Sequence, residues 1–160
     1  MAMIDHYINT IVERGADEAR KDGSATVEAQ HLLLAIAAER NPVTHQVLTS
    51  VGLDHQAIRD ALDKEFEQSL GAAGVSLAAF GLPRPSPAPK RSPNLGASAK
   101  LALERGLVSA AGKKDLRPAH LLLGILLAEV GTVPRALAAA GVDRADLTAR
   151  VRQTLTGEGE

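Results

Sequence analysis

The sequence predicts an all-α protein made of two tandem, pseudo-symmetric four-helix repeats, with eight helices in total. The first observation is a phrase that occurs twice, HLLLAI from His31 and HLLLGI from His120, at an offset of 120 − 31 = 89 positions. The second is that the same offset aligns the VGLD motif at 51–54 with the AGVD motif at 140–143. The third is a hydrophobic content of 45% with only 2% aromatic residues, so the core must consist of Ala, Leu, Val and Ile, which favours closely packed helices.

Further matches extend the repeat over most of the chain. At the same offset Gly23 aligns with Gly112 and Leu62 with Val151, so the alignment is expected to need no gap. Agreement at well-separated points indicates that a whole structural unit recurs. We therefore expect one compact domain in four parts: a first repeat at 1–67, a proline-rich linker at 68–93, a second repeat at 94–156 and a flexible tail at 157–160.

Helical periodicity and end signals define the first half of each repeat. In the first repeat a helix with Tyr7, Ile8 and Ile11 on one stripe ends at the KDG turn of 21–23. Thr26 is expected to cap the second helix, over 27–38, whose nearly continuous apolar surface indicates a central position. The corresponding helices of the second repeat are predicted at 95–111 and 116–129.

The second half of each repeat carries clearer capping residues. Asn41 and Pro42 open a short third helix that stops at Gly52. Asp54 caps the fourth helix, and Asp143 is the matching cap in the second repeat. The inner face of the fourth helix is expected to hold Ile58, Ala61, Leu62 and Phe66. The second repeat is predicted to finish with helices at 132–140 and 143–155.

The linker has a composition of its own. Five prolines between Pro83 and Pro93 exclude a regular helix or central strand and favour an extended connector with polyproline II character. Phe80 lies just before them. We interpret Phe80 as packing the linker against a helix, with an exposed hydrophobic contact for a partner as the alternative.

Charge and composition restrict the function. A formal net charge of -1 provides no general attraction to a nucleic-acid backbone or an anionic membrane, and no apolar run is long enough to span a bilayer. There is no cysteine, so disulfides, thiolate catalysis and cysteine-ligated zinc are excluded. We expect a cytoplasmic protein that binds neither nucleic acid nor membrane.

Residues with catalytic potential do not form recognisable motifs. The histidines lack the spacing of a metal site; His31 and His120 are expected to donate to a backbone group at a helix end or to pack between the repeats, and His6, His45 and His55 to face solvent. No Gly-x-Ser-x-Gly elbow is present, and GLVSAAGKK at 106–114 departs from the phosphate-binding loop pattern. Asp60, Asp63, Glu65 and Glu67 are interpreted as a solvated helix face. We therefore predict no enzyme activity, no metal, no cofactor and no ATP binding.

The repeated HLLLxI phrase and the [VA]-G-[LV]-D motif resemble the N-terminal domain of the Clp/Hsp100 unfoldases, the Clp repeat domain, of the ClpC and ClpA type. The resemblance covers nearly the whole chain and implies a docking platform for adaptors, substrates and regulators, here as a stand-alone protein without the ATPase modules. Relatives that bind phosphoarginine have a glutamate before each phrase and a threonine near the start of each repeat. Here the glutamate positions hold Gln30 and Ala119. The threonine position of the first repeat aligns with Asp5, and Ser92 or Asn94 is the nearest candidate in the second, so phosphoarginine recognition is not expected.

The resemblance and the charge pattern together suggest a site. Relatives place an aromatic residue at the start of each repeat, where this sequence has Ile4 and Pro93. The basic residues Lys90, Arg91, Lys100 and Arg105 are either a solvated surface or a patch for an acidic partner. The predicted peptide-binding or partner-binding residues are Ile4, Asp5, Gln30, Phe80, Lys90, Arg91, Asn94, Lys100 and Ala119.

The function expected from these features is non-catalytic binding of proteins or peptides, as an adaptor or regulator of Clp-dependent proteolysis. The partners would be Clp components or their clients, held in a groove between the first helices of the two repeats. The alternative is a decoy that sequesters Clp-targeting cyclic-peptide antibiotics or other peptides. The oligomeric state is open.

Overall fold

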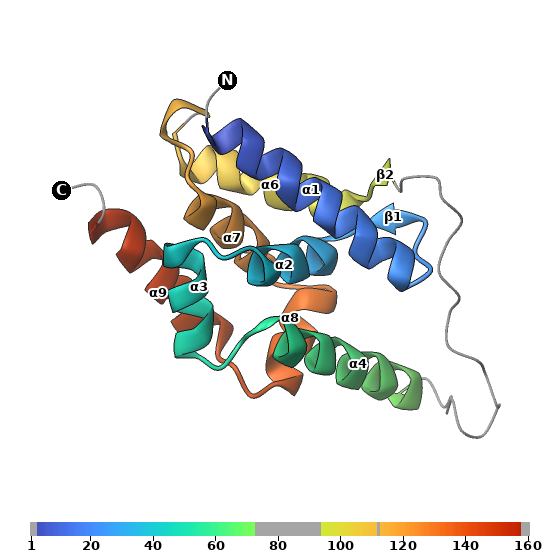
Figure 1. Ribbon diagram of the computed structural model, residues 1–160. Coiled ribbons are helices and arrows are strands. Elements are labelled where there is room, and N and C mark those ends of the chain that lie inside the picture. Colours follow the sequence, from blue (N-terminus) through green and yellow to red (C-terminus); the bar gives the residue numbers. More distant parts are fainter. Residues whose placement is uncertain (1–2, 73–93, 112, 158–160) are drawn as a thin grey trace.

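The computed structural model describes residues 3–72, 94–111 and 113–157 and confirms the predicted all-α fold (Figure 1). Phe80, Lys90, Arg91 and Gly112 lie outside these residues. Within the described ranges there are eight α-helices, together with one 3-10 turn (Lys113–Asp115) and two short strands, β1 (Thr26–Val27) and β2 (Asn94–Leu95). The helices are α1 (Met3–Lys21), α2 (Ala29–Ala38), α3 (Pro42–Ser50), α4 (His55–Ala72), α6 (Ala97–Ser109), α7 (Pro118–Leu126), α8 (Thr132–Ala139) and α9 (Arg144–Gly157).

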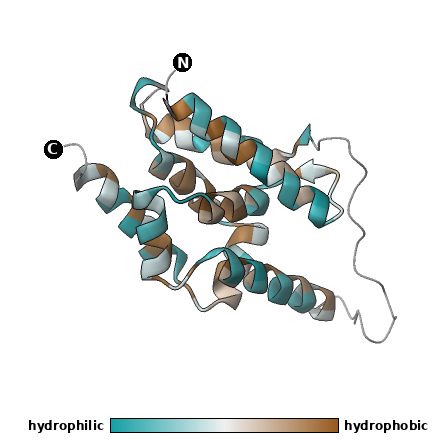
Figure 2. Ribbon diagram, viewed as in Figure 1, coloured by the Kyte–Doolittle hydropathy of each residue, from teal (hydrophilic) through white to brown (hydrophobic). Residues whose placement is uncertain are grey.

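The core is built around α2 and α7, which carry the repeated phrase. Leu34 of α2 and Leu122 of α7 are fully buried, and the hydrophobic colouring in Figure 2 is concentrated on these two helices. Each is covered by the first helix of its own repeat, α1 on α2 and α6 on α7. The remaining helices pack across the repeats, α4 against α8 and α3 against α9. The two repeats therefore share one core. None of the described helices is long and apolar enough to cross a membrane.

The predicted caps of the later helices are present. The Asn41 side chain accepts hydrogen bonds from the backbone N–H groups of Val43 and Thr44, each at 3.2 Å. Asp54 accepts from the Ala57 N–H at 2.7 Å, and Asp143 accepts from Ala145 at 2.9 Å. These side chains satisfy the unpaired N–H groups of the first helical turn, which is why their sequence signals were reliable.

The start of α2 differs from the prediction. Thr26 is not a cap but part of β1, which pairs in parallel with β2 so that Thr26 lies opposite Asn94 and Val27 opposite Leu95. The Gly96 N–H continues this pairing by donating to the Val27 carbonyl at 2.8 Å. Pairing with β2 keeps residues 26–27 extended, so α2 begins at Ala29 with Glu28 as its N-cap.

The alignment of the two repeats needs a gap of two residues. Gly15 and Gly106 occupy equivalent places, because an added Cβ would lie 3.6 Å from the His31 carbonyl oxygen in the first case and 2.8 Å from that of His120 in the second. Their offset is 106 − 15 = 91, whereas the phrases differ by 89. The segment between the first two helices is thus two residues shorter in the second repeat, and the prediction of a gapless alignment was wrong.

The inner face of α4 also differs from the prediction. Phe66 is 47% exposed, whereas Glu65 is 6% exposed. Glu65 accepts hydrogen bonds from Arg135 of α8 at 2.8 Å and from Ser69 at 2.8 Å. Its carboxylate is buried because a cation from the other repeat neutralises it, which an apolar periodicity cannot indicate.

A charged network joins α1, α2 and α4. Glu18 accepts from His55 Nε2 at 3.1 Å and from Arg59 at 2.7 Å, and Arg59 also donates to Asp22 at 2.7 Å. Asp22 in turn accepts from His31 Nε2 at 3.1 Å. Burial acts to raise the pKa of Glu18 and of Asp22, but the hydrogen bonds and positive charges of these partners outweigh it and lower both pKa values. His55 therefore belongs to an ion-pair network and is not simply solvated.

Candidate ligand-binding groove

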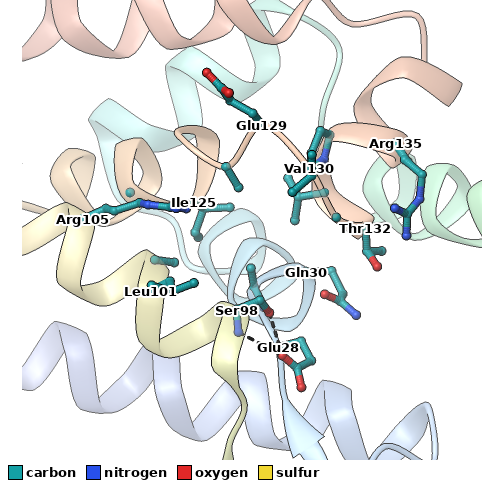
Figure 3. Close-up of a pocket in the computed structure, with 17 residues that line it drawn as sticks. Glu28, Gln30, Ser98, Leu101, Arg105, Ile125, Glu129, Val130, Thr132 and Arg135 are labelled. Atoms are coloured by element: carbon teal, nitrogen blue, oxygen red, sulfur yellow. Dashed lines mark hydrogen bonds between the residues drawn. The ribbon is translucent and has the colours of Figure 1, made fainter.

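An open groove of about 340 Å³ runs along the second repeat. It lies between α6 on one side and the end of α7, the α7–α8 connection and the first turn of α8 on the other, with the start of α2 at its margin (Figure 3). Only α6, of the two first helices, contributes to its lining. This groove therefore lies in a different place from the predicted groove, which was expected between α1 and α6, the first helices of the two repeats.

The groove has a largely apolar lining that includes small residues. Leu101 of α6 is 45% exposed and Val130 of the α7–α8 connection is 86% exposed, on opposite sides of the groove. Ile125 lies between them (Figure 3). Ala102 and Ala128 also line the groove; Ala102 is buried at 3% exposure, and Ala128 is half-buried. Exposed apolar side chains that gather around a concave surface are typical of a binding site.

Polar groups without a partner stand at the rim. Arg105 extends from α6 toward Ile125 (Figure 3), and it makes no hydrogen bond or ion pair with any described residue. The side chains of Gln30 and Thr132 also line the groove and are likewise unpartnered in the described ranges. Arg135, in contrast, is neutralised by Glu65. The exposed carboxylate of Glu129 also lines the groove and has no partner among the described residues. The groove thus offers one positive charge, one negative charge and two hydrogen-bonding side chains to a ligand.

Glu28 and Ser98 close one end of the groove. The Glu28 carboxylate accepts hydrogen bonds from the Ser98 hydroxyl at 2.6 Å and from the Ser98 N–H at 3.3 Å, in the first turn of α6. The Ser98 hydroxyl accepts from the Ala29 N–H, in the first turn of α2, at 2.8 Å. Burial acts to raise the pKa of Glu28, but the hydrogen bonds from Ser98 and Thr26 outweigh it and lower the pKa. Both groups are therefore occupied in capping helices.

The two histidines of the repeated phrase have equivalent structural roles. His31 Nδ1 accepts the backbone N–H of Glu28 at 2.9 Å, and His120 Nδ1 accepts that of Arg117 at 3.0 Å. They bind a helix-end backbone group as expected, but they accept the hydrogen bond instead of donating it. Burial and the nearby charge of Arg117 lower the pKa of His120, which matches the neutral, accepting form. No group of His, Asp or Glu side chains among the described residues is suited to hold a metal ion.

The predicted site residues are distributed over several places. Gln30 lines the groove. Lys100 is exposed on α6 and Asn94 is exposed in β2, both outside the groove lining. Ile4 and Asp5 are half-buried near the start of α1, and Ala119 is buried in α7. The structure does not bring these residues together in one cavity, and a binding role for these positions stays a prediction.

Sequence reasoning did not identify Leu101, Val130 or Ser98 as site residues, and it considered Arg105 only as part of a basic run. One feature of the sequence could have given the correct alignment of the first helices. Glu13-Arg14-Gly15 recurs as Glu104-Arg105-Gly106, at the offset of 91 that the structure shows. This match places Ser98 at the position of Tyr7, and Leu95 and Gly96 at those of Ile4 and Asp5, where the offset of 89 had suggested Pro93 and Asn94.

Comparison with known proteins identifies the class of the protein. The chain belongs to the Clp repeat (R) N-terminal domain family, whose family model matches residues 3–106. This confirms the family suggested by the repeated phrase. A comparison with curated proteins gave no match.

Two solved structures are similar over almost their full lengths. The N-terminal domain of the caseinolytic protease associated chaperone ClpD from Arabidopsis thaliana is 19% identical, with a TM-score of 0.61 over 92% of this chain and 91% of that one. A structure described as part of a malarial protein secretion system is 16% identical, with a TM-score of 0.59 over 92% of this chain and 90% of that one. At these identities the likeness concerns the fold.

Proposed function

We propose that this protein binds segments of other proteins without catalysing a reaction, and that it acts as an adaptor or regulator of Clp-dependent proteolysis. The family supplies the protein-binding domain of Clp chaperones, and ClpD is described as a chaperone associated with the caseinolytic protease. The observation that carries the proposal is the open apolar groove, which ends at the start of α2 and carries an unpartnered arginine.

Two leucines of α6 provide a matched test. Leu101 is 45% exposed inside the groove, and Leu107 is 42% exposed outside its lining. We expect Leu101→Asp to abolish recovery of Clp components or clients in quantitative affinity capture from host extract, because it places a charge on the apolar lining. Leu107→Asp should retain recovery, since it adds the same charge elsewhere on the same helix.

Equal recovery by both variants and by the unchanged protein would contradict the assignment of binding to the groove. Recovery of no Clp component, together with a raised melting temperature in the presence of a Clp-targeting cyclic peptide, would support the sequestration of such peptides instead, because a ligand that binds only the folded state stabilises it.

A further inference from the structure

The groove has a filled counterpart in the first repeat. With the first helices aligned at an offset of 91 and the following helices at 89, the groove-lining residues Ser98, Ala102 and Ala128 correspond to Tyr7, Ile11 and Glu39. The first repeat therefore has large or charged side chains at three positions where the second repeat has small ones. It shows what kind of groups this site accommodates.

In the first repeat the chain supplies an aromatic ring at this site. Tyr7 packs against the core, and its hydroxyl is buried beside Thr44 and Glu39. Thr44 corresponds to Val133, which lines the groove in the second repeat. With Ser98 in place of Tyr7 and Ala128 in place of Glu39, the second repeat has neither the ring nor the carboxylate at these positions, which line its open groove.

The first repeat also contains an arginine that is paired with a carboxylate. Arg14 Nε lies 3.0 Å from Glu39 Oε2. The equivalent arginine is Arg105, but Ala128 stands in place of Glu39. Arg105 forms no ion pair with a described residue, although the exposed Glu129 lines the same groove. Arg105 is half-buried, and a guanidinium that is partly removed from water gains most from a carboxylate partner.

We propose that the groove binds a peptide segment that presents an aromatic side chain next to an acidic one. The ring lies in the space that corresponds to the Tyr7 ring, against Ala102 and Val133, and the acidic side chain pairs with Arg105. Gln30 and Thr132 are placed at the rim to hydrogen-bond the peptide backbone. This inference rests on the proposed function and specifies the segment that is recognised.

A blocked pentapeptide tests the recognition directly. The probe is acetyl-Gly-Glu-Phe-Glu-Gly-amide, in which glutamates on both sides of the phenylalanine cover either order along the groove. In a titration of the ¹⁵N-labelled full chain, we expect saturable shifts at the amides of Leu101, Arg105 and Val130. Replacing the phenylalanine by alanine, or both glutamates by glutamine, should each weaken binding about fivefold or more, because each removes one of the two contacts.

Two variants of the protein place side chains of the first repeat at the equivalent positions of the second. Ala128→Glu supplies the carboxylate that Glu39 provides in the first repeat, and Ala102→Ile adds the branched side chain that Ile11 has there. Each is expected to weaken peptide binding about tenfold or more, since each replaces a contact of the ligand by one from the chain. Ala138→Glu is the matched control, because it adds the same charge at an exposed position of α8 outside the groove lining. Melting temperatures establish that each variant is folded.

The outcomes separate this inference from the proposed function. Equal binding of the glutamate and glutamine peptides, or equal binding by Ala128→Glu and Ala138→Glu, would overturn the proposed specificity even if capture of Clp partners depends on Leu101. Absence of any groove shift at millimolar peptide would overturn it too. Loss of capture in Leu101→Asp, together with the expected peptide results, would support both the proposed function and the proposed peptide specificity.

Discussion

The hydroxyl of Ser98 and the carboxylate of Glu28 cap each other's helices across the junction of the two repeats. Ser98 accepts from the first turn of α2, and Glu28 accepts from the first turn of α6, although they lie 98 − 28 = 70 positions apart. One pair of side chains thereby satisfies helix ends in both repeats and fixes the margin of the groove. The stability of this junction should be measurable by single substitutions.

Ser98→Ala is expected to lower the free energy of unfolding by about 1–2 kcal/mol, because it removes a cap and leaves the Glu28 carboxylate with one hydroxyl partner fewer. Urea denaturation measures the effect. Ser109→Ala is the control on the same helix, since Ser109 donates only to the carbonyl of Gly106 in its own turn. It should cost no more than about 0.5 kcal/mol. Equal losses in the two variants would contradict the capping role of Ser98.

Gly96→Ala should destabilise the junction through a steric contact. An added Cβ would lie 2.0 Å from Glu28 Oε2, so the carboxylate must move and give up its hydrogen bonds to Ser98. Gly71→Ala in α4, where nothing lies within 4 Å of the added Cβ, should instead stabilise the helix by about 0.5–1 kcal/mol. In a double-mutant cycle, Gly96→Ala should cost much less when Glu28 is already alanine. Additive effects would show that the contact is not the cause.

Acid should destabilise the protein through the carboxylates of the charged network. The pKa values of Glu18 and Asp22 are lowered from 4.5 and 3.8, so the unfolded chain binds more protons in acid than the folded one. The contribution to stability is complete above these unfolded values and is lost as the pH falls through the lower, folded ones. Urea midpoints measured from neutral pH into this acid range should therefore decline, and Glu18→Gln should reduce the decline.

The control for the acid prediction is Glu67→Gln on the exposed side of α4, where Glu67 makes no hydrogen bond or ion pair with a described residue. This variant should retain the pH dependence of the parent protein. If the urea midpoint of Glu18→Gln declined in acid as steeply as that of Glu67→Gln, the charged network would not be the source of the acid sensitivity.

Tyr7→Phe is expected to leave the stability unchanged or to raise it by up to about 1 kcal/mol. The Tyr7 hydroxyl is buried without a hydrogen-bond partner among the described residues, so its removal relieves a desolvation cost. Tyr7→Ala should cost about 3 kcal/mol or more, because it removes the ring from the first repeat's core. Chemical denaturation distinguishes the two. A clear loss of stability in Tyr7→Phe would mean that the hydroxyl has a partner, with Thr44 the nearest candidate.

Local signals made the helix plan predictable from the sequence. Asn41, Asp54 and Asp143 bind backbone groups within three residues of themselves, so their roles follow from position alone. Glu28, Glu65 and Arg59 have partners in distant segments, and no local pattern distinguishes them from solvated charges. The prediction therefore gave the elements and their order but misplaced residues that depend on contacts between elements.

The groove was harder to predict than the fold because it results from residues that are small. Nothing about Ser98, Ala102 or Ala128 indicates binding when each is considered alone. These residues stand out only when they are compared with Tyr7, Ile11 and Glu39 of the first repeat. That comparison requires the first helices to be aligned at an offset of 91 instead of 89. Alignment on the HLLLxI phrase alone hides the correspondence.

The packing of α4 on α8 and of α3 on α9 has an evolutionary consequence. An ancestor with a single repeat would have buried the same surfaces against a second copy of itself, as a symmetric homodimer. Duplication and fusion of such a repeat converts an association between two molecules into one within a chain, and it leaves the two copies free to diverge. Glu28 and its counterpart Arg117, at 28 + 89 = 117, show such a difference between the copies. Glu28 accepts a hydrogen bond from Ser98 of the other repeat, whereas Arg117 donates to the Leu155 carbonyl of its own repeat.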